Sequence, residues 1–382
     1  MSTTVLILSN HFITLYAFRR ELIAKLVADG YRVVLSMPAD ERNSFFSALG
    51  CEVIETAVAR HGINPVADLR LILKYRAVMK VVEPDVVLSF TIKPNIYGSI
   101  ASRMLGIQHI SNITGTGEVF LSESLISKII RALYRVSIRR DHKVFFQNSS
   151  DQAYFASHGL VGNNHELLPG SGVNLEEHPV VDLPPDDVVK FIFVGRVMKI
   201  KGIDEYLECA RAVREKFRNT RFFVAGFIED ERYRGLIEQS QRAGCVDYIG
   251  FRDDLAEWIA RCHCTVLPSH GGEGVPNALL ESAATGRACI ASDIAGARDV
   301  VDDGANGFLF QAHSSDDLTR SVIRFVELSF DEKRAMGLAG RRKVEGRFDR
   351  ERVIDAYLRE IRLLGSKPRL RRPMDPGLPN FL

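Results

Sequence analysis

Short apolar runs alternate with longer amphipathic stretches along most of the chain. Runs rich in β-branched and aromatic residues predict strands, and apolar positions repeating every three or four residues predict helices. The strands predicted in the first half are Val5–Ser9, Arg32–Ser36, Glu52–Glu55, Asp85–Phe90, His109–Ile113, Lys143–Gln147 and Glu166–Leu168. The helices predicted among them include Phe12–Ala28, Pro65–Val82, Asn95–Leu105 and Leu121–Arg140. This alternation is typical of βαβ units that form a parallel sheet.

The same alternation restarts after the proline-containing segment Leu183–Asp187, which we interpret as a linker. The strands predicted beyond it are Lys190–Val194, Arg221–Ala225, Asp247–Gly250, Thr265–Leu267 and Ala288–Ala291. We therefore predict an α/β protein of two Rossmann-like, doubly wound domains, 1–183 and 187–348, that face each other across a cleft. Helix 350–364 is expected to pack back on the first domain, and the Pro- and Arg-rich tail 366–382 to be flexible.

Composition narrows the class of protein. A chain of 382 residues with 46% hydrophobic and 26% charged residues matches a two-domain globular protein. Its net charge of +2 provides no global attraction to nucleic acid, so no such partner is expected. Met1–Leu8 lacks the basic region and cleavage site of a signal peptide, and no apolar run is long enough to span a bilayer. These features favour a cytoplasmic location.

The six cysteines form no C-x-x-C pair and are expected to be reduced core thiols. Cys262-His263-Cys264 is either part of a metal site or the buried entry to a strand. No second pair of ligands lies at useful spacing, so we favour the structural interpretation and expect no metal.

The segment Ser269–Ala284 carries the most informative chemistry. Glu273 and Glu281 are eight positions apart, with a glycine-rich turn before the first and a predicted helix under the second. The start of that helix offers unpaired N–H groups and a positive dipole, which favour an anion such as a diphosphate. Glu281 can accept paired hydrogen bonds from a ribose diol. A diphosphate and a diol together indicate a nucleotide sugar.

A second motif supplies cations at the start of the second domain. Its first predicted strand ends in Gly195-Arg196, and Lys201 precedes the next helix. Arg196 can bind phosphate oxygens in a bidentate manner, while Lys201 supplies a compact charge. The alternative is that both are solvated loop charges, an interpretation that the glutamate motif disfavours. Because the sequence contains no D-x-D, we expect the diphosphate to be neutralised without metal or other cofactor.

The order of these motifs resembles that of the retaining glycosyltransferases of the GT-B fold, family-four type. The motifs are Gly195-Arg196, Lys201-Gly202, Ile249–Asp253 and the E-x7-E stretch from Glu273 to Glu281. The resemblance continues downstream at Asp293–Gly296, Asp303-Gly304 and Asn306–Phe308, and so covers nearly the whole second domain.

The resemblance implies roles for individual residues. Arg196, Lys201 and Glu273 would be the catalytic residues, acting on the diphosphate and the donor sugar. The donor-binding set would comprise Gly195, Arg196, Lys201, Phe251, Arg252, Glu273, Gly274, Val275, Pro276, Asn277 and Glu281. No carboxylate stands out as a nucleophile for double displacement. The mechanism usual in the family is front-face substitution, in which the leaving phosphate helps to deprotonate the acceptor hydroxyl.

First-domain residues just beyond strand ends should line the acceptor side of the cleft. We assign to it Asn10, His11, Lys93, Thr114, Gly115, Thr116 and Gly117. Lys93 would contact an acceptor phosphate, and 114–117 offers hydroxyls and backbone donors. For His11, a role in capping or in the core is the main alternative.

The motifs at 89–98 and 112–117 resemble a subgroup of bacterial enzymes that extend sugars on undecaprenyl diphosphate, adding N-acetylhexosamine such as N-acetylgalactosamine. The resemblance implies a UDP-sugar donor and a polyprenyl-diphosphate-linked saccharide as acceptor. The enzyme would be a metal-independent retaining hexosyltransferase in polysaccharide biosynthesis or protein glycosylation.

The predicted helix Leu121–Arg140 agrees with a lipid acceptor, because it carries Lys128, Arg131, Arg135 and Arg139 beside many apolar residues. Such a helix can lie on an anionic membrane surface, or it can be a core helix with a solvated basic face. The first interpretation places the protein peripherally on the inner face of the cell membrane.

Two other functions remain open from the sequence. A GT-B nucleotide-sugar epimerase would need acid–base residues around the bound sugar, and no such cluster is evident. A non-catalytic nucleotide-sugar-binding protein at the membrane would not require all of Arg196, Lys201, Glu273 and Glu281.

Overall fold

The computed structural model describes residues 2–58, 64–117, 120 and 124–365. Its first half contains a parallel sheet in the order β3-β2-β1-β4-β5-β6-β7. The strands are β1 (Thr4–Leu8), β2 (Arg32–Met37), β3 (Glu52–Glu55), β4 (Val86–Phe90), β5 (Gln108–Ile113), β6 (Lys143–Phe146) and β7 (His165–Leu167). Chain order reverses between β1 and β4, which makes that position the topological switch point of the sheet.

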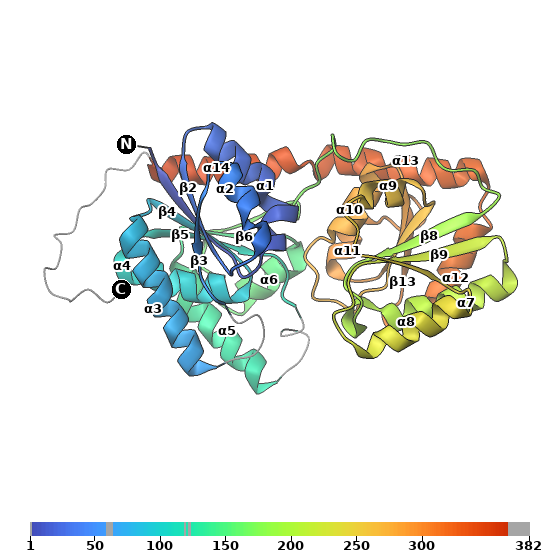
Figure 1. Ribbon diagram of the computed structural model, residues 1–382, viewed down its shortest axis with the longest axis horizontal. Helices are drawn as coiled ribbons and strands as arrows, with labels where there is room; N and C mark the ends of the chain where they lie inside the picture. The colour runs from blue at the N-terminus through green and yellow to red at the C-terminus, as the bar shows by residue number, and fades with distance from the viewer. Residues whose placement is uncertain (1, 59–63, 118–119, 121–123, 366–382) are drawn as a thin grey trace, which may run out of the picture.

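Helices cover both faces of this sheet (Figure 1). They are α1 (Phe12–Ala28), α2 (Ser44–Ala48), α3 (Pro65–Val82), α4 (Ser99–Leu105), α5 (Leu125–Ser137) and α6 (Ser149–Ser157). The helix predicted at Asn95–Leu105 is instead a π-helical turn, Pro94–Gly98, followed by α4. The prediction Leu121–Arg140 corresponds to α5 and a 3₁₀ turn, Ile138–Arg140, while 121–123 lies outside the described residues.

The second half contains another parallel sheet, in the order β10-β9-β8-β11-β12-β13. Its strands are β8 (Val189–Val194), β9 (Thr220–Ala225), β10 (Asp247–Gly250), β11 (Cys264–Leu267), β12 (Ala288–Ser292) and β13 (Gly307–Phe310). Its helices are α7 (Ile203–Lys216), α8 (Arg232–Arg242), α9 (Leu255–Ala260), α10 (Asn277–Ala284), α11 (Ala295–Val300), α12 (Ser315–Val326) and α13 (Phe330–Arg347). The predicted fold class, two Rossmann-like sheets of the GT-B type, is confirmed, although sequence analysis missed β13.

Helix α14 (Arg350–Gly365) returns to the first sheet along the top of Figure 1, drawn in red. Val353, Tyr357 and Leu358 are buried in the same core cluster as Val5 of β1 and Leu88 of β4. Each sheet has a large apolar core of its own, and the two halves are held together by chain crossings and by the loop contacts described below.

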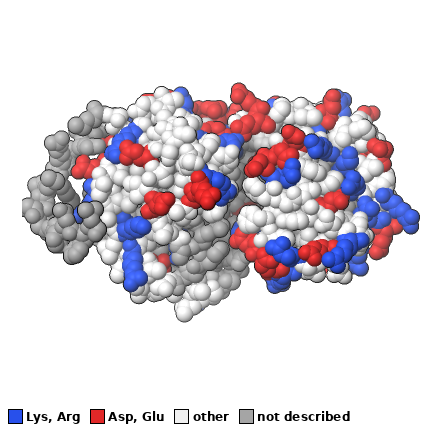
Figure 2. Space-filling view, in the orientation of Figure 1, with Lys and Arg blue, Asp and Glu red and all other residues white. Residues whose placement is uncertain are grey.

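Charged residues of both signs are interspersed over the face shown in Figure 2, where no single-sign field dominates. Within the described residues, no helix combines the length and apolar character needed to cross a bilayer.

Candidate active site

The glutamate motif and the cationic motif meet at the switch point of the second sheet. The chain leaves β8 into Gly195-Arg196 and leaves β11 into the loop that carries Glu273, and these two strands are neighbours. A 3₁₀ turn, Lys199–Lys201, brings Lys201 to the same edge. Gly202 makes this approach possible: its φ is +73°, and a Cβ there would lie 1.9 Å from the carbonyl oxygen of Pro268.

Lys201 and Glu273 form an ion pair through Nζ and Oε1, and Ser269 Oγ donates to the same carboxylate oxygen at 2.8 Å. Burial opposes ionisation of Glu273, but the charge of Lys201 and these hydrogen bonds outweigh it, so the pKa of Glu273 is lowered. Both side chains are mostly buried, with 20% and 17% exposed. Glu273 is therefore an ionised, fixed carboxylate at neutral pH.

Arg196 is oriented by Glu229, whose Oε1 lies 3.2 Å from Arg196 Nη1. Its side chain is 37% exposed, and the positive charge also helps to lower the pKa of Glu273. The guanidinium has five N–H donors, so one bond to Glu229 leaves others to contact an anion.

Helix α10 begins directly after Pro276, which occupies the N-cap position with φ −69°. Val275 and Pro276 are buried, whereas Asn277 is partly exposed and its side-chain Nδ2 has no hydrogen-bond partner within the described residues. The first turn of α10 thus presents a polar group that a ligand can satisfy.

Glu281 lies one turn further along α10. Burial raises its pKa to about 7, and the nearby charges of Arg350 and Arg20 only partly oppose this. The two glutamates of the motif therefore differ: the pKa of Glu273 is lowered beside Lys201, whereas burial raises the pKa of Glu281 to about 7.

The predicted base-contact turn follows β10. Phe251 has an exposed side chain, and Arg252 donates to both carboxylate oxygens of Asp254 at 2.7 Å.

The predicted acceptor segment 114–117 lies against the donor loop of the other domain. The Gly117 amide donates to the carbonyl of Gly272 at 3.1 Å, and Asn148 Nδ2 donates to the carbonyl of Glu273 at 3.2 Å. At Gly115, an added Cβ would lie 2.7 Å from the Gly272 oxygen and from the Gly274 nitrogen. The two domains consequently meet through glycine backbone beside Glu273.

Two other predicted acceptor residues, His11 and Lys93, have partners within the first domain. His11 caps α1, its Nδ1 accepting from the Ile13 amide at 3.1 Å, which matches the capping alternative. Lys93 forms an ion pair of 3.0 Å with Asp68, and both side chains are largely buried. Asn10 is partly exposed. To bind an acceptor phosphate, Lys93 would have to give up its ion pair with the Asp68 carboxylate.

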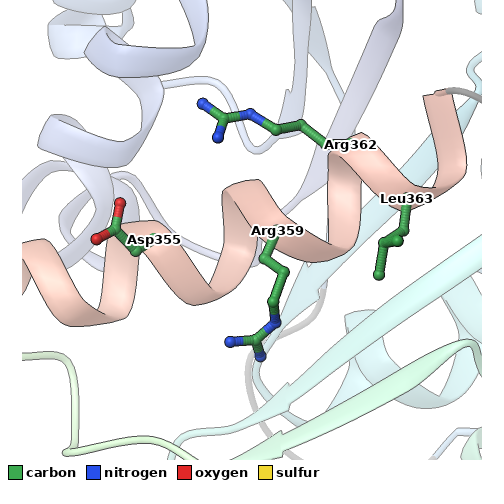
Figure 3. A pocket seen from close by; sticks show the side chains of 4 residues that line it. All are labelled: Asp355, Arg359, Arg362 and Leu363. Carbon is green, nitrogen blue, oxygen red and sulfur yellow. The ribbon is translucent and has the colours of Figure 1, made fainter.

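An interdomain cavity of ≈ 320 Å³ borders the donor loop at Val275 and reaches Gln147, Asp299 and Arg352. A wider depression of ≈ 510 Å³ lies on α14 and is lined by Asp355, Arg359, Arg362 and Leu363 (Figure 3). All of these lining residues belong to α14, and none belongs to the glutamate motif. Arg359 is paired with Glu166, and Arg362 lies near Asp29.

Sequence analysis missed Glu229, which orients Arg196 from 33 positions away, because this pairing depends on tertiary structure. It also missed Ser269, which donates to Glu273. Ser269 lies inside the quoted motif and was detectable as a hydroxyl near Glu273. Cys262 and Cys264 are buried free thiols, and His263 Nδ1 accepts from the Lys190 amide at 3.0 Å.

Comparisons with known proteins agree with this architecture. Residues 4–148 match the family model Glycosyl transferase 4-like, and residues 189–327 match Glycosyl transferases group 1. The chain is 25% identical over 370 residues to the N,N'-diacetylbacillosaminyl-diphospho-undecaprenol alpha-1,3-N-acetylgalactosaminyltransferase of Campylobacter jejuni, covering 92% of this chain and 96% of the relative. It is 22% identical over 285 residues to the UDP-Gal:alpha-D-GlcNAc-diphosphoundecaprenol alpha-1,3-galactosyltransferase of Escherichia coli, covering 69% and 72%.

Solved structures show the same fold. Anabaena HepE in complex with UDP and glucose superimposes with a TM-score of 0.76 at 18% identity, covering 94% of this chain and 98% of that one. Sucrose-phosphate synthase from Thermosynechococcus elongatus gives a TM-score of 0.78 at 18% identity, covering 95% and 99%. The two family models together cover most of the chain, which belongs to the GT-B glycosyltransferases, with a glycosyl transferase 4-like domain followed by a group 1 domain.

Proposed function

We propose that this protein is a metal-independent, retaining transferase that moves N-acetylhexosamine from a UDP-sugar to a saccharide linked to polyprenyl diphosphate. The observation that carries the proposal is the Lys201–Glu273 ion pair beside Arg196 at the switch point of the second sheet. The names of the Campylobacter and Escherichia relatives, which include diphospho-undecaprenol acceptors, support the choice of acceptor. The UDP bound to Anabaena HepE supports the choice of nucleotide.

The diphosphate would be bound by Arg196 and Lys201. Both cations are held by carboxylates, which order their side chains at the edge of the sheet. Charge develops on the diphosphate as the glycosidic bond breaks, and preorganised cations stabilise that charge without reorganisation. Glu281 would accept hydrogen bonds from the ribose diol.

Glu273 would position the sugar by accepting hydrogen bonds from its hydroxyls. Its carboxylate is already bonded to Lys201 and Ser269, which suits a fixed acceptor and is unfavourable for a nucleophile that must reach the anomeric carbon. We therefore propose front-face substitution: the acceptor oxygen bonds to the anomeric carbon as the bond to the diphosphate breaks, and the acceptor proton passes to the departing phosphate oxygen.

The acceptor lipid would approach through the first domain. On α5, the buried side chains Ile130 and Tyr134 pack on the core, while Leu125, Ile126 and Ile129 are exposed. These apolar side chains, together with exposed Lys128, would form the membrane-contacting face.

Two of the four cations that the sequence placed on this face contact α6 instead. Arg131 donates to the Tyr154 hydroxyl at 2.9 Å, and Arg135 donates to the His158 carbonyl at 2.7 Å. The exposed apolar side chains of α5 thus contribute more to the proposed face than the sequence indicated.

Exchange of Lys201 tests the catalytic assignment. Protein, UDP-N-acetylhexosamine and a short polyprenyl-diphosphate sugar are incubated in excess EDTA, and UDP release is measured. Lys201→Ala should lower kcat by on the order of a hundredfold or more, the scale for one lost electrostatic donor. Lys199→Ala, at an exposed lysine two residues earlier, is the matched control and should retain activity.

Nuclear magnetic resonance of the product would establish the anomeric configuration. Retention of the donor configuration is expected. Inversion would contradict the proposed mechanism, and normal turnover by Lys201→Ala would contradict the proposed site.

A further inference from the structure

Three side chains outside the proposed sugar site converge beside the donor loop. Glu205 lies in the first turn of α7, His270 begins the glycine-rich turn, and His313 lies between β13 and α12. One ligand atom from each lies within 4.8 Å of the others. His270 Nε2 is 2.9 Å from Glu205 Oε1, and the two imidazole rings are 3.9 Å apart between centroids.

One carboxylate oxygen of Glu205 accepts no hydrogen bond from the described residues. Glu205 is 9% exposed, and its Oε2 is buried without a hydrogen-bond partner within the described residues. Burying a carboxylate oxygen without a hydrogen-bond partner costs free energy, and a bound ligand would remove this cost. His313, in contrast, is exposed and gives an ion a route from solvent.

We propose that Glu205, His270 and His313 bind one divalent transition-metal ion of the zinc class. Two imidazoles and one carboxylate are a set that zinc accepts, with water as the fourth ligand, whereas magnesium and calcium prefer oxygen ligands alone. Zinc–ligand bonds of about 2.0–2.1 Å in tetrahedral geometry require ligand atoms about 3.4 Å apart. The ligand atoms of the three side chains lie within 4.8 Å of one another, and His270 Nε2 is 2.9 Å from Glu205 Oε1.

The ion would join three segments that support the donor site. Glu205 is four residues beyond Lys201, and His270 is three residues before Glu273. The His270 amide already donates to the Ile200 carbonyl at 2.8 Å, so the first two segments are in contact. The ion would add the β13–α12 turn to this contact. It would touch neither Arg196 nor Lys201, so its role would be structural and compatible with transfer in EDTA.

Zinc titration of the full-length, tag-free protein tests the site. Calorimetry with ZnCl₂ after removal of bound metal should show one equivalent per chain, with a Kd in the micromolar range or tighter. His313→Asn should weaken binding at least tenfold. Asparagine suits this test because His313 has φ +63°, a left-handed conformation that asparagine tolerates.

His158→Asn, at an exposed histidine in the first domain, is the control and should bind zinc as the unmodified protein does. Co²⁺ provides a second readout independent of activity, because tetrahedral nitrogen–oxygen coordination gives visible absorption bands, and these should disappear in His313→Asn and Glu205→Gln. Absence of stoichiometric binding in the unmodified protein, or undiminished binding in His313→Asn, would overturn the proposal.

Discussion

At the scale of single residues, the pKa values of the two glutamates of the motif are shifted in opposite directions. Glu273 has a lowered pKa because Lys201 and Ser269 compensate its burial. Among the described residues Glu281 has no hydrogen-bonded cation of this kind, and burial raises its pKa to about 7. A carboxylate that must accept two hydroxyl donors is more effective when ionised, so the proposed role of Glu281 couples donor binding to release of a proton.

Glu281 should make both stability and donor binding depend on pH. Its folded pKa lies above the ordinary value of 4.5, so the native state binds the proton more tightly than the unfolded chain. The free energy of unfolding should therefore fall as the pH rises from about 4.5 to about 7. Glu281→Gln should remove this decline, which thermal unfolding across that pH range would measure.

Donor binding provides the complementary measurement. Calorimetry with a UDP-sugar near pH 6.5, in two buffers of different ionisation enthalpy, should show proton release that is absent in Glu281→Gln. The phosphates of a UDP-sugar do not titrate in this range. Equal heats in both buffers would show that Glu281 does not ionise on binding.

At the scale of secondary-structure elements, the interdomain contact beside Glu273 is made mainly by the glycine backbone of two loops, with one side chain, Asn148, donating across it. Gly115 and the donor loop approach so closely that backbone meets backbone, and this contact fixes the position of Glu273 relative to the first domain. The proximity of these loops depends on glycine at both sides.

Gly115→Ala should separate the loops. Its added Cβ meets the Gly272 oxygen and the Gly274 nitrogen at 2.7 Å, and these backbone atoms cannot move independently of Glu273. We expect kcat to fall by roughly tenfold to a hundredfold, as for a small misplacement of a catalytic group. Gly106→Ala is the control, because Gly106 also has a positive φ but a Cβ added there would meet no atom within 4 Å. Similar loss of turnover in both variants would indicate general backbone strain.

Strand and helix periodicity predicted most elements but not the contacts between them. The strand pattern indicated both sheets because buried parallel strands are continuous apolar runs. β13 was missed because Gly307–Phe310 is short and begins with glycine. The pairing of Arg196 with Glu229, 33 positions apart, and of Lys93 with Asp68 depends on tertiary structure and has no local signature.

At the scale of the whole molecule, the proposed lipid substrate requires a particular orientation on the bilayer. Exposed apolar side chains lie on α5 and also on α3, at Leu69 and Leu73. Both helices are at the lower left of Figure 1, on the first domain. This position leaves the second domain to bind the water-soluble nucleotide sugar.

Membrane attachment should weaken when apolar residues of α5 are replaced. Ile126→Asp with Ile129→Asp should reduce binding to mixed phosphatidylcholine–phosphatidylglycerol vesicles by about tenfold or more, because burying each isoleucine contributes about 1.5–3 kcal/mol. Flotation measures the bound fraction. Leu236→Asp, at an exposed leucine of α8, should have no effect. Unchanged flotation of the double variant would remove α5 from the proposed face.

Helix α14 also affects how the protein is synthesised. Its apolar side chains complete the core around β1 and β4, yet the ribosome makes them only after the whole of 189–347. The nascent first domain therefore keeps part of its apolar surface uncovered until α14 has been made. Strands β1 and β4 acquire their last apolar layer only after α14 has been made.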